Sequence, residues 1–86
     1  MRDVRFPGNT FEDFLEWGQD NKQVQKRIVR LILEIRRTPF DGIGKPEALK
    51  GNLSGFWSRR IDDEHRLIYE VTDDEIIIHS VKGHYS

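Results

Sequence analysis

The sequence predicts an α+β fold in which a helical hairpin covers one face of an antiparallel sheet. Apolar residues recur with a helical period over residues 10–37 and with a period of two over residues 56–82. Acidic triplets at 62–64 and 73–75 divide the second half into three strand-length pieces. With a short alternating segment at the start, the predicted order is β-α-α-β-β-β.

Length and composition limit the chain to one small domain, residues 1–86. The 86 residues include no cysteine, which excludes a disulfide scaffold and a cysteine-based zinc site. No apolar run reaches the roughly 18 residues of a membrane span, and the start lacks the apolar core of a signal peptide. We therefore expect a soluble cytoplasmic protein with no membrane partner.

Positive charge is concentrated in the middle third of the chain. The net charge is −1 overall, but it is −3 over residues 1–21, +5 over residues 22–50 and −3 over residues 51–86. The overall value gives no global indication of a polyanion partner, and the basic middle is typical of a solvated helix face.

The first elements are a short strand and a helix. Residues 3–6 alternate polar and apolar up to Pro7, which suits an edge strand. Asn9 or Thr10 offers a helix N-cap. The predicted core-facing stripe of this helix comprises Phe11, Phe14, Leu15 and Gly18, and Trp17 lies off it.

A second helix is predicted to follow at once. It starts near Asp20 or Asn21 and ends at Thr38-Pro39, because the residue before a proline avoids the helical region. Its core stripe comprises Val24, Ile28, Leu31, Ile32 and Ile35, widened by Val29 and Leu33.

A glycine-rich loop is predicted over residues 41–55. It has no sustained period and carries Lys45, Glu47 and Lys50. Loops of this length in compact domains are often functional.

The strand register places two arginines together. If the hairpin closes over residues 62–64, Arg60 lies opposite Arg66 on one face of the sheet, while Arg59 lies on the face toward the helices. Two interpretations stay open, because each arginine of the facing pair could bind a nearby carboxylate or the two could form a phosphate site.

The chain end is the second candidate region. The last predicted strand runs directly into His84 and Tyr85, which favours an ordered end over a frayed one. His65 and His79 are expected to be structural or merely exposed. The sequence contains no Ser-His-Asp order, phosphate-binding glycine loop or zinc-ligand spacing.

Five separated segments together resemble one known family. They are Arg36-Arg37-Thr38-Pro39-Phe40, Gly44-Lys45-Pro46-Glu47-Ala48-Leu49-Lys50, Asn52-Leu53-Ser54-Gly55-Phe56-Trp57-Ser58-Arg59-Arg60-Ile61, Glu64-His65-Arg66-Leu67-Ile68-Tyr69 and His84-Tyr85. In this order they are similar to the YoeB branch of the RelE/ParE toxin superfamily, over nearly the whole chain.

The resemblance implies a fold like that of microbial ribonucleases and a toxin that cuts mRNA in the ribosomal A site without metal or cofactor. It implies Glu47 as general base, His84 as general acid and Arg66 as phosphate stabiliser. It also implies Tyr85 as an aromatic residue that shapes the site. The RNA- or phosphate-binding residues are then Lys50, Arg60 and Arg59.

The same resemblance implies the partners. They are the 70S ribosome with its mRNA and a YefM-like antitoxin that wraps the toxin, and a homodimer is one candidate assembly. Two alternatives remain. One is a ParE-like DNA gyrase poison without enzymatic activity, and the other is an inactive module that only binds the antitoxin.

Overall fold

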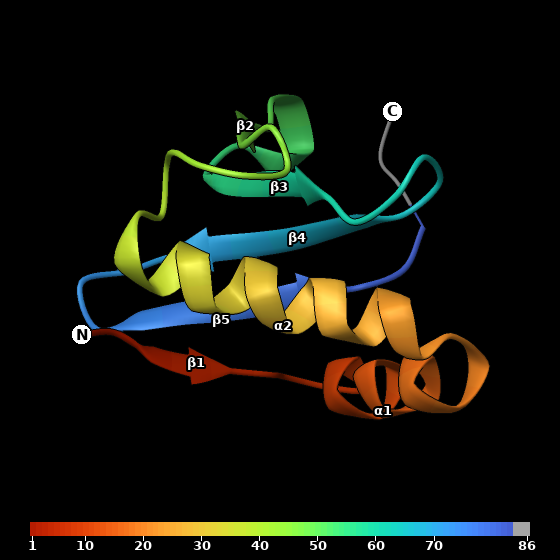
Figure 1. Cartoon of the computed structure of the whole chain (residues 1–86). Helices are drawn as coiled ribbons and strands as arrows, with labels where there is room; N and C mark the ends of the chain where they lie inside the picture. The colour runs from red at the N-terminus through yellow and green to blue at the C-terminus, as the bar shows by residue number, and fades with distance from the viewer. Residues whose placement is uncertain (84–86) are drawn as a thin grey trace.

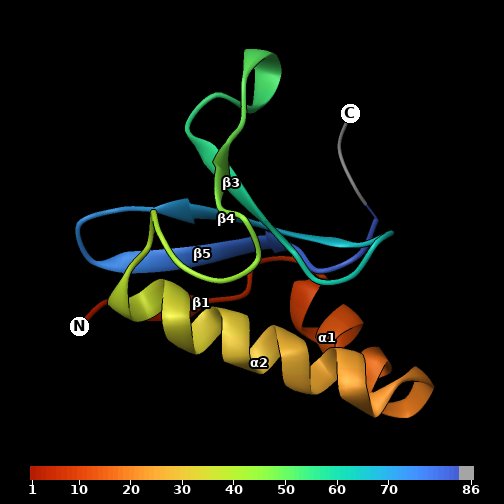
Figure 2. The ribbon, with the colours of Figure 1, turned by 45° about the horizontal axis from the view of Figure 1, so that its top comes forward.

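The computed structural model describes residues 1–83. In this part of the chain, two helices cover one face of a five-stranded sheet, as Figures 1 and 2 show from two directions. The helices are α1 (Thr10–Asp20) and α2 (Lys22–Arg37), with a short 3₁₀ turn η1 (Gly51–Leu53). The strands are β1 (Asp3–Arg5), β2 (Glu47–Ala48), β3 (Phe56–Arg60), β4 (Arg66–Val71) and β5 (Glu75–Ser80).

The strand order across the sheet is β1-β5-β4-β3-β2. Strands β3, β4 and β5 pair antiparallel with one another, as predicted, and the unpredicted β2 pairs antiparallel with β3, but β1 pairs parallel with β5. The expectation of a wholly antiparallel sheet was therefore wrong, and the sheet is mixed. Parallel neighbours need a long crossover connection, and nearly the whole chain separates these two strands. The local pattern at the N-terminus predicted a strand but not its partner.

Helix α2 follows the prediction in its bounds and its central stripe, but Val29 and Leu33, which were expected to widen that stripe, are 41% and 55% exposed. Asn21 is the only residue between the helices, and its side chain accepts hydrogen bonds from the amides of Gln23 and Val24 at 3.1 and 3.3 Å. This capping satisfies two amides that have no partner within the helix. The buried positions of α2 are the predicted ones, Val24, Ile28, Leu31, Ile32 and Ile35.

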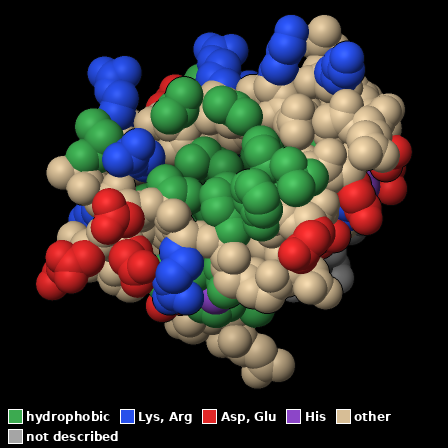
Figure 3. Space-filling model, turned by 90° about the horizontal axis from the view of Figure 1, so that it is seen from below, with side chains coloured by type: hydrophobic (Ala, Val, Ile, Leu, Met, Phe, Trp, Pro, Cys, Tyr) green, Lys and Arg blue, Asp and Glu red, His purple; other side chains and the backbone are tan. Residues whose placement is uncertain are grey.

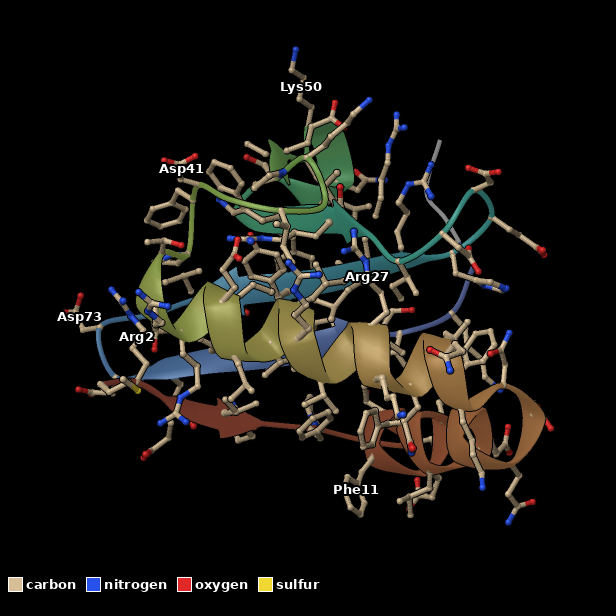
Figure 4. The ribbon with its side chains drawn as sticks, viewed as in Figure 1. Arg2, Phe11, Arg27, Asp41, Lys50 and Asp73 are labelled. Atoms are coloured by element: carbon tan, nitrogen blue, oxygen red, sulfur yellow. The ribbon has the colours of Figure 1, made fainter. Side chains whose placement is uncertain are left out.

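Helix α1 uses a different face from the predicted one. Phe11 and Leu15 are 47% and 50% exposed, whereas Thr10 is buried and Phe14 and Trp17 pack against the core. The contact stripe has the spacing i, i+4, i+7, which is as helical as the predicted one but rotated. Phe11 therefore points outward (Figure 4), and Figure 3 shows that apolar side chains gather on the side of the molecule seen from below.

Both acidic triplets lie in or beside the turns between strands. In the first, the carboxylate of Asp62 accepts hydrogen bonds from the amides of Glu64 and His65 at 2.9 and 2.6 Å. In the second, the hydroxyl of Thr72 accepts from the amides of Asp74 and Glu75. Such side-chain bonds to the backbone stabilise tight turns and thereby hold the register of the flanking strands.

The two faces of the sheet differ. The helix-covered face supplies buried residues to the main core, among them Leu67, Tyr69, Ile76 and Ile78. Neither α1 nor α2 lies on the opposite side, which we call the open face (Figure 2). Neither helix is long and apolar enough to cross a membrane within residues 1–83.

Candidate active site

Glu47 lies on the open face because of a strand that the sequence did not predict. Within the expected loop, Glu47 and Ala48 form β2 and pair with Ser58 and Trp57 of β3. Glu47 lies directly opposite Ser58, so both side chains share one face. The amide of Arg60 donates to the carbonyl of Gly44 at 2.6 Å, which extends this pairing toward the start of the loop. A strand of two residues is too short to stand out from a glycine-rich loop by its periodicity.

Arg60 and Arg66 face each other on the same open face, and the predicted register between β3 and β4 is confirmed. Residues directly opposite in such a pair have Cβ atoms about 4.5–5.5 Å apart. Arg60 is exposed and Arg66 is half-buried. Two like charges are therefore held close together where a polyanion can reach them.

The carboxylate-pairing interpretation does not describe this pair. Within residues 1–83, neither Arg60 nor Arg66 forms an ion pair. The Nη1 atom of Arg66 donates instead to the carbonyl oxygens of Asp62 and His65, at 2.8 and 3.1 Å. Oε1 of Glu70, a carboxylate on the same strand as Arg66, lies 3.0 Å from Nε2 of His79. The cationic charge of the facing pair is therefore not neutralised by a carboxylate of the described residues.

Glu47 lies close to this arginine pair. Ser58 and Arg60 are two residues apart on β3, so Glu47 and Arg60 are diagonal neighbours with Cβ atoms roughly 7–8 Å apart. Lys50 follows at the tip of the same segment and extends away from the helices (Figure 4). A carboxylate, two guanidinium groups and an ammonium group are thus carried by three adjacent strands and one loop.

Arg59 does not belong to this surface, which corrects its prediction as a phosphate-binding residue. Its side chain is 0% exposed and points toward the helices. Its nitrogen atoms donate to Tyr69 Oη (3.2 Å), Glu34 Oε1 (3.1 Å) and the carbonyl oxygens of Thr38 (2.6 Å), Asp41 (2.8 Å) and Ile43 (3.1 Å). Successive residues of a strand point to opposite faces, so Arg59 and Arg60 cannot both reach the open face.

The partners of Arg59 have shifted pKa values. The pKa of Glu34 is lowered, chiefly by the hydrogen bond from the amide of Ile43 and further by Arg59. The pKa of Tyr69 is raised because burial disfavours the phenolate, although Arg59 opposes this shift. The lowered pKa keeps Glu34 ionised as it accepts from Arg59, and the raised pKa keeps on Tyr69 the proton that it donates to the carbonyl of Pro39.

The chain is anchored beside Arg66 just before the predicted His84 and Tyr85, which themselves lie outside the described residues. The amide of Arg66 donates to the carbonyl of Gly83 at 2.7 Å, and the amide of Gly83 donates to Nδ1 of His65 at 2.8 Å. The ring of His65 packs edge-on against Trp17, with centroids 4.9 Å apart, and Nε1 of Trp17 donates to the carbonyl of Val81.

Sequence reasoning missed this anchoring role of Trp17 and His65. The only signal was that Trp17 lies off the predicted helical stripe. His65 takes a structural place, as expected.

His79 of β5 lies on the open face, at the end away from the Arg60–Arg66 pair. His79 stacks on Phe56 with ring centroids 4.4 Å apart and contacts Glu70. No group of three His, Asp or Glu side chains within residues 1–83 is placed to hold a metal ion. Around the arginine pair, the described part of the open face offers the carboxylate of Glu47 and the cations of Arg60, Arg66 and Lys50.

Comparisons with known proteins agree with this fold. A family model described as the YoeB-like toxin of bacterial type II toxin-antitoxin systems matches residues 6–85. Toxin YoeB of Mycobacterium bovis is 55% identical over 85 residues, which cover 99% of this chain and 100% of that protein. The YoeB dimer of Staphylococcus aureus superposes with a TM-score of 0.90 at 46% identity and covers 98% of both chains.

A second solved structure contains a partner protein. The heterotetrameric YoeB-YefM toxin-antitoxin complex of Staphylococcus aureus holds a chain that superposes with a TM-score of 0.88 at 45% identity, covering 99% of both chains. Because the family model and relatives above half identity cover nearly the whole chain, the sequence resemblance is confirmed. The chain belongs to the YoeB-like toxins of bacterial type II toxin-antitoxin systems.

Proposed function

We propose that this toxin is a ribosome-dependent endoribonuclease that cleaves mRNA in the A site by attack of a ribose 2′-hydroxyl on the adjacent phosphate. One observation carries the proposal. The Arg60–Arg66 pair, which no carboxylate of residues 1–83 neutralises, shares a face with Glu47 in a chain of the YoeB family. A site of this composition suits a reaction that accumulates negative charge on phosphate oxygens and needs a base nearby.

In this mechanism Glu47 is the general base that removes the proton of the 2′-hydroxyl. The 2′-oxygen attacks phosphorus, and the bond to the 5′-oxygen of the next nucleotide breaks. Arg66 and Arg60 stabilise the negative charge of the phosphorane, since guanidinium groups donate in a planar fork that fits phosphate oxygens. Lys50 adds a further cation at the edge of the site.

His84 is the general acid of the mechanism and protonates the leaving 5′-oxygen. An imidazole has an ordinary pKa of about 6.5, which suits proton donation near neutral pH. The position of Gly83 beside Arg66 supports this role, because His84 is the next residue in the chain. Tyr85 supplies an aromatic surface near the scissile nucleotide. The products are a 2′,3′-cyclic phosphate and a free 5′-hydroxyl.

We further propose the cytoplasm as its location, because the substrate is a translating ribosome. A YefM-like antitoxin is the proposed partner, and a homodimer the proposed assembly. The similar YoeB chains from Staphylococcus aureus form a dimer in one structure and a complex with YefM in another. An antitoxin that covers residues 44–50 would block access to Glu47.

The rival functions make different use of the same fold. A gyrase poison or an inactive antitoxin-binding module needs no base and no acid, so loss of Glu47 or His84 would leave its effect intact. The arginine pair, which has no carboxylate partner among residues 1–83, favours the nuclease, because like charges placed directly opposite each other destabilise a sheet unless a ligand compensates them.

Primer extension on mRNA held in purified 70S ribosomes tests the proposal. The wild-type protein should produce a new stop within the A-site codon, and Glu47→Ala and His84→Ala should not. Intact mRNA with the wild-type protein would refute the nuclease, and supercoiling assays with gyrase would then test the first rival.

A further inference from the structure

The cluster of Glu34, Arg59 and Tyr69, which we call the arginine cluster, holds the segment that leads to Glu47; Arg59 and Tyr69 are buried and Glu34 is half-buried. Three of the five oxygen acceptors of Arg59 are carbonyl groups of residues 38–43. Glu34 also accepts from the amide of Ile43 at 2.5 Å, and the hydroxyl of Tyr69 donates to the carbonyl of Pro39 at 2.7 Å. The cluster therefore bonds this segment at four successive points.

The segment has little structure of its own. No helix or strand lies between α2 and β2. Gly42, Gly44 and Lys45 have positive φ values of 119°, 82° and 52°. Glycine adopts such values readily but many others as well, and β2 itself has only two residues, so local propensity does not fix this path. Contacts from outside the segment must therefore define its course.

Arginine is the residue type that this arrangement requires. The acceptors of Arg59 surround its planar guanidinium group, whose five N–H donors point outward in fixed directions. A lysine has all its donors on one atom and cannot reach the same set of acceptors. The charge of the buried group is balanced by Glu34, at 3.1 Å.

Arg59 also links the segment to the candidate site. Its backbone neighbour on β3 is Arg60, so one strand carries a cation of the open face and, on its other face, the anchor of the segment that carries Glu47. We propose that Arg59 is a positioning residue, which sets the location of Glu47 relative to the Arg60–Arg66 pair. This inference rests on the proposed function, in which Glu47 is the general base.

A base displaced by about 1 Å can cost on the order of 100-fold in rate. The inference therefore predicts a loss of the chemical step in variants that stay folded. Tyr69→Phe keeps the buried ring but removes one acceptor of Arg59 and the bond to Pro39. Arg59→Lys keeps the charge but loses most of the acceptors. Val24→Ala is the control, because it weakens the core at the first turn of α2, away from this segment.

The experiment measures single-turnover cleavage of mRNA on saturating 70S ribosomes, at a temperature where circular dichroism shows every variant to be folded. Ribosome affinity is measured in parallel. We expect Tyr69→Phe to lower the rate roughly 10-fold and Arg59→Lys roughly 100-fold, with unchanged affinity. Val24→Ala should cleave at the wild-type rate.

The outcomes separate the inference from the proposed function. If the wild-type protein does not cleave, the proposed function fails, and the inference fails with it. If the wild-type protein cleaves and both cluster variants keep its rate, or lose no more than Val24→Ala, the inference alone is overturned. A loss that appears only as weaker ribosome binding also overturns it.

Discussion

Arg60 on β3 and Arg66 on β4 lie directly opposite each other on the open face, and neither forms an ion pair within residues 1–83. Proteins tend to avoid like charges in this relationship, because it costs roughly 0.2–1 kcal/mol of stability. A phosphate-binding site would explain the arrangement, because a bound anion offsets the repulsion between the two guanidinium groups.

Inorganic phosphate or sulfate should therefore raise the melting temperature. At about five times the Kd, the stabilisation is about 1 kcal/mol, which corresponds to roughly 4–8 °C for a domain of this size. Differential scanning calorimetry against sodium chloride of equal ionic strength measures the effect. Arg60→Gln should abolish it and should itself melt slightly above the wild type in chloride. A melting temperature that falls on adding phosphate would contradict this account of the pair.

Glu34 should contribute to stability in a pH-dependent way. Its pKa in the folded state is lowered from 4.5, so its contribution is present above pH 4.5 and is lost as the pH falls through the folded pKa. Urea unfolding of the wild type and Glu34→Gln from about pH 7 to about pH 3 measures this. The stability difference between them should shrink at the acid end. If the difference in unfolding free energy between the wild type and Glu34→Gln were constant over this pH range, the ionised carboxylate of Glu34 would not be the source of its contribution to stability.

The fold around Gly42 should not tolerate a side chain. Its φ is 119°, and a Cβ atom there would collide with Oε1 of Glu34. Gly42→Ala should cost roughly 1–3 kcal/mol from the backbone alone, and more from displacing Glu34. Gly51→Ala is a matched control, because Gly51 has a φ of 64° but open space around it. Equal losses of unfolding free energy for the two variants, measured in urea, would contradict the close approach of Glu34 to Gly42.

His65 should protect the backbone just before His84. Nδ1 of His65 accepts from the amide of Gly83 at 2.8 Å, so His65→Ala leaves this amide without its partner. Hydrogen exchange followed by NMR should show faster exchange at Gly83 in His65→Ala and no change in His79→Ala. Since Gly83 precedes the proposed general acid, we also expect His65→Ala to cleave roughly 10-fold more slowly. Unaltered exchange at Gly83 would refute this anchoring role.

The sequence predicted most of the fold because its signals are local. The helical stripe of α2, its cap at Asn21 and the period-two strands each arise from a few neighbouring residues. The register of Arg60 with Arg66 followed from the length of a turn that Asp62 stabilises. The parallel pairing of β1 and the rotated stripe of α1 depend on tertiary packing, which a local pattern does not contain.

The candidate site divides in the same way. Arg60 lies on the open face and Arg59 is buried because successive residues of a strand point to opposite faces. The resemblance to the family nevertheless led to the prediction that both arginines bind phosphate. The position of Glu47 depends on the pairing of β2 with β3. This pairing forms because Arg59, a buried residue, holds the loop that precedes β2. The anchoring of Gly83 by His65 joins distant parts of the chain and has no local signal.

The most direct test of the central claim is a substrate that lacks the nucleophile. An mRNA with 2′-deoxynucleotides in the A-site codon, held in 70S ribosomes, is compared by primer extension with the all-ribose mRNA. The account predicts a cut in the all-ribose codon and none in the deoxy codon, because Glu47 then has no 2′-hydroxyl to activate. Equal cleavage of both codons would contradict attack by the 2′-oxygen and with it the proposed mechanism.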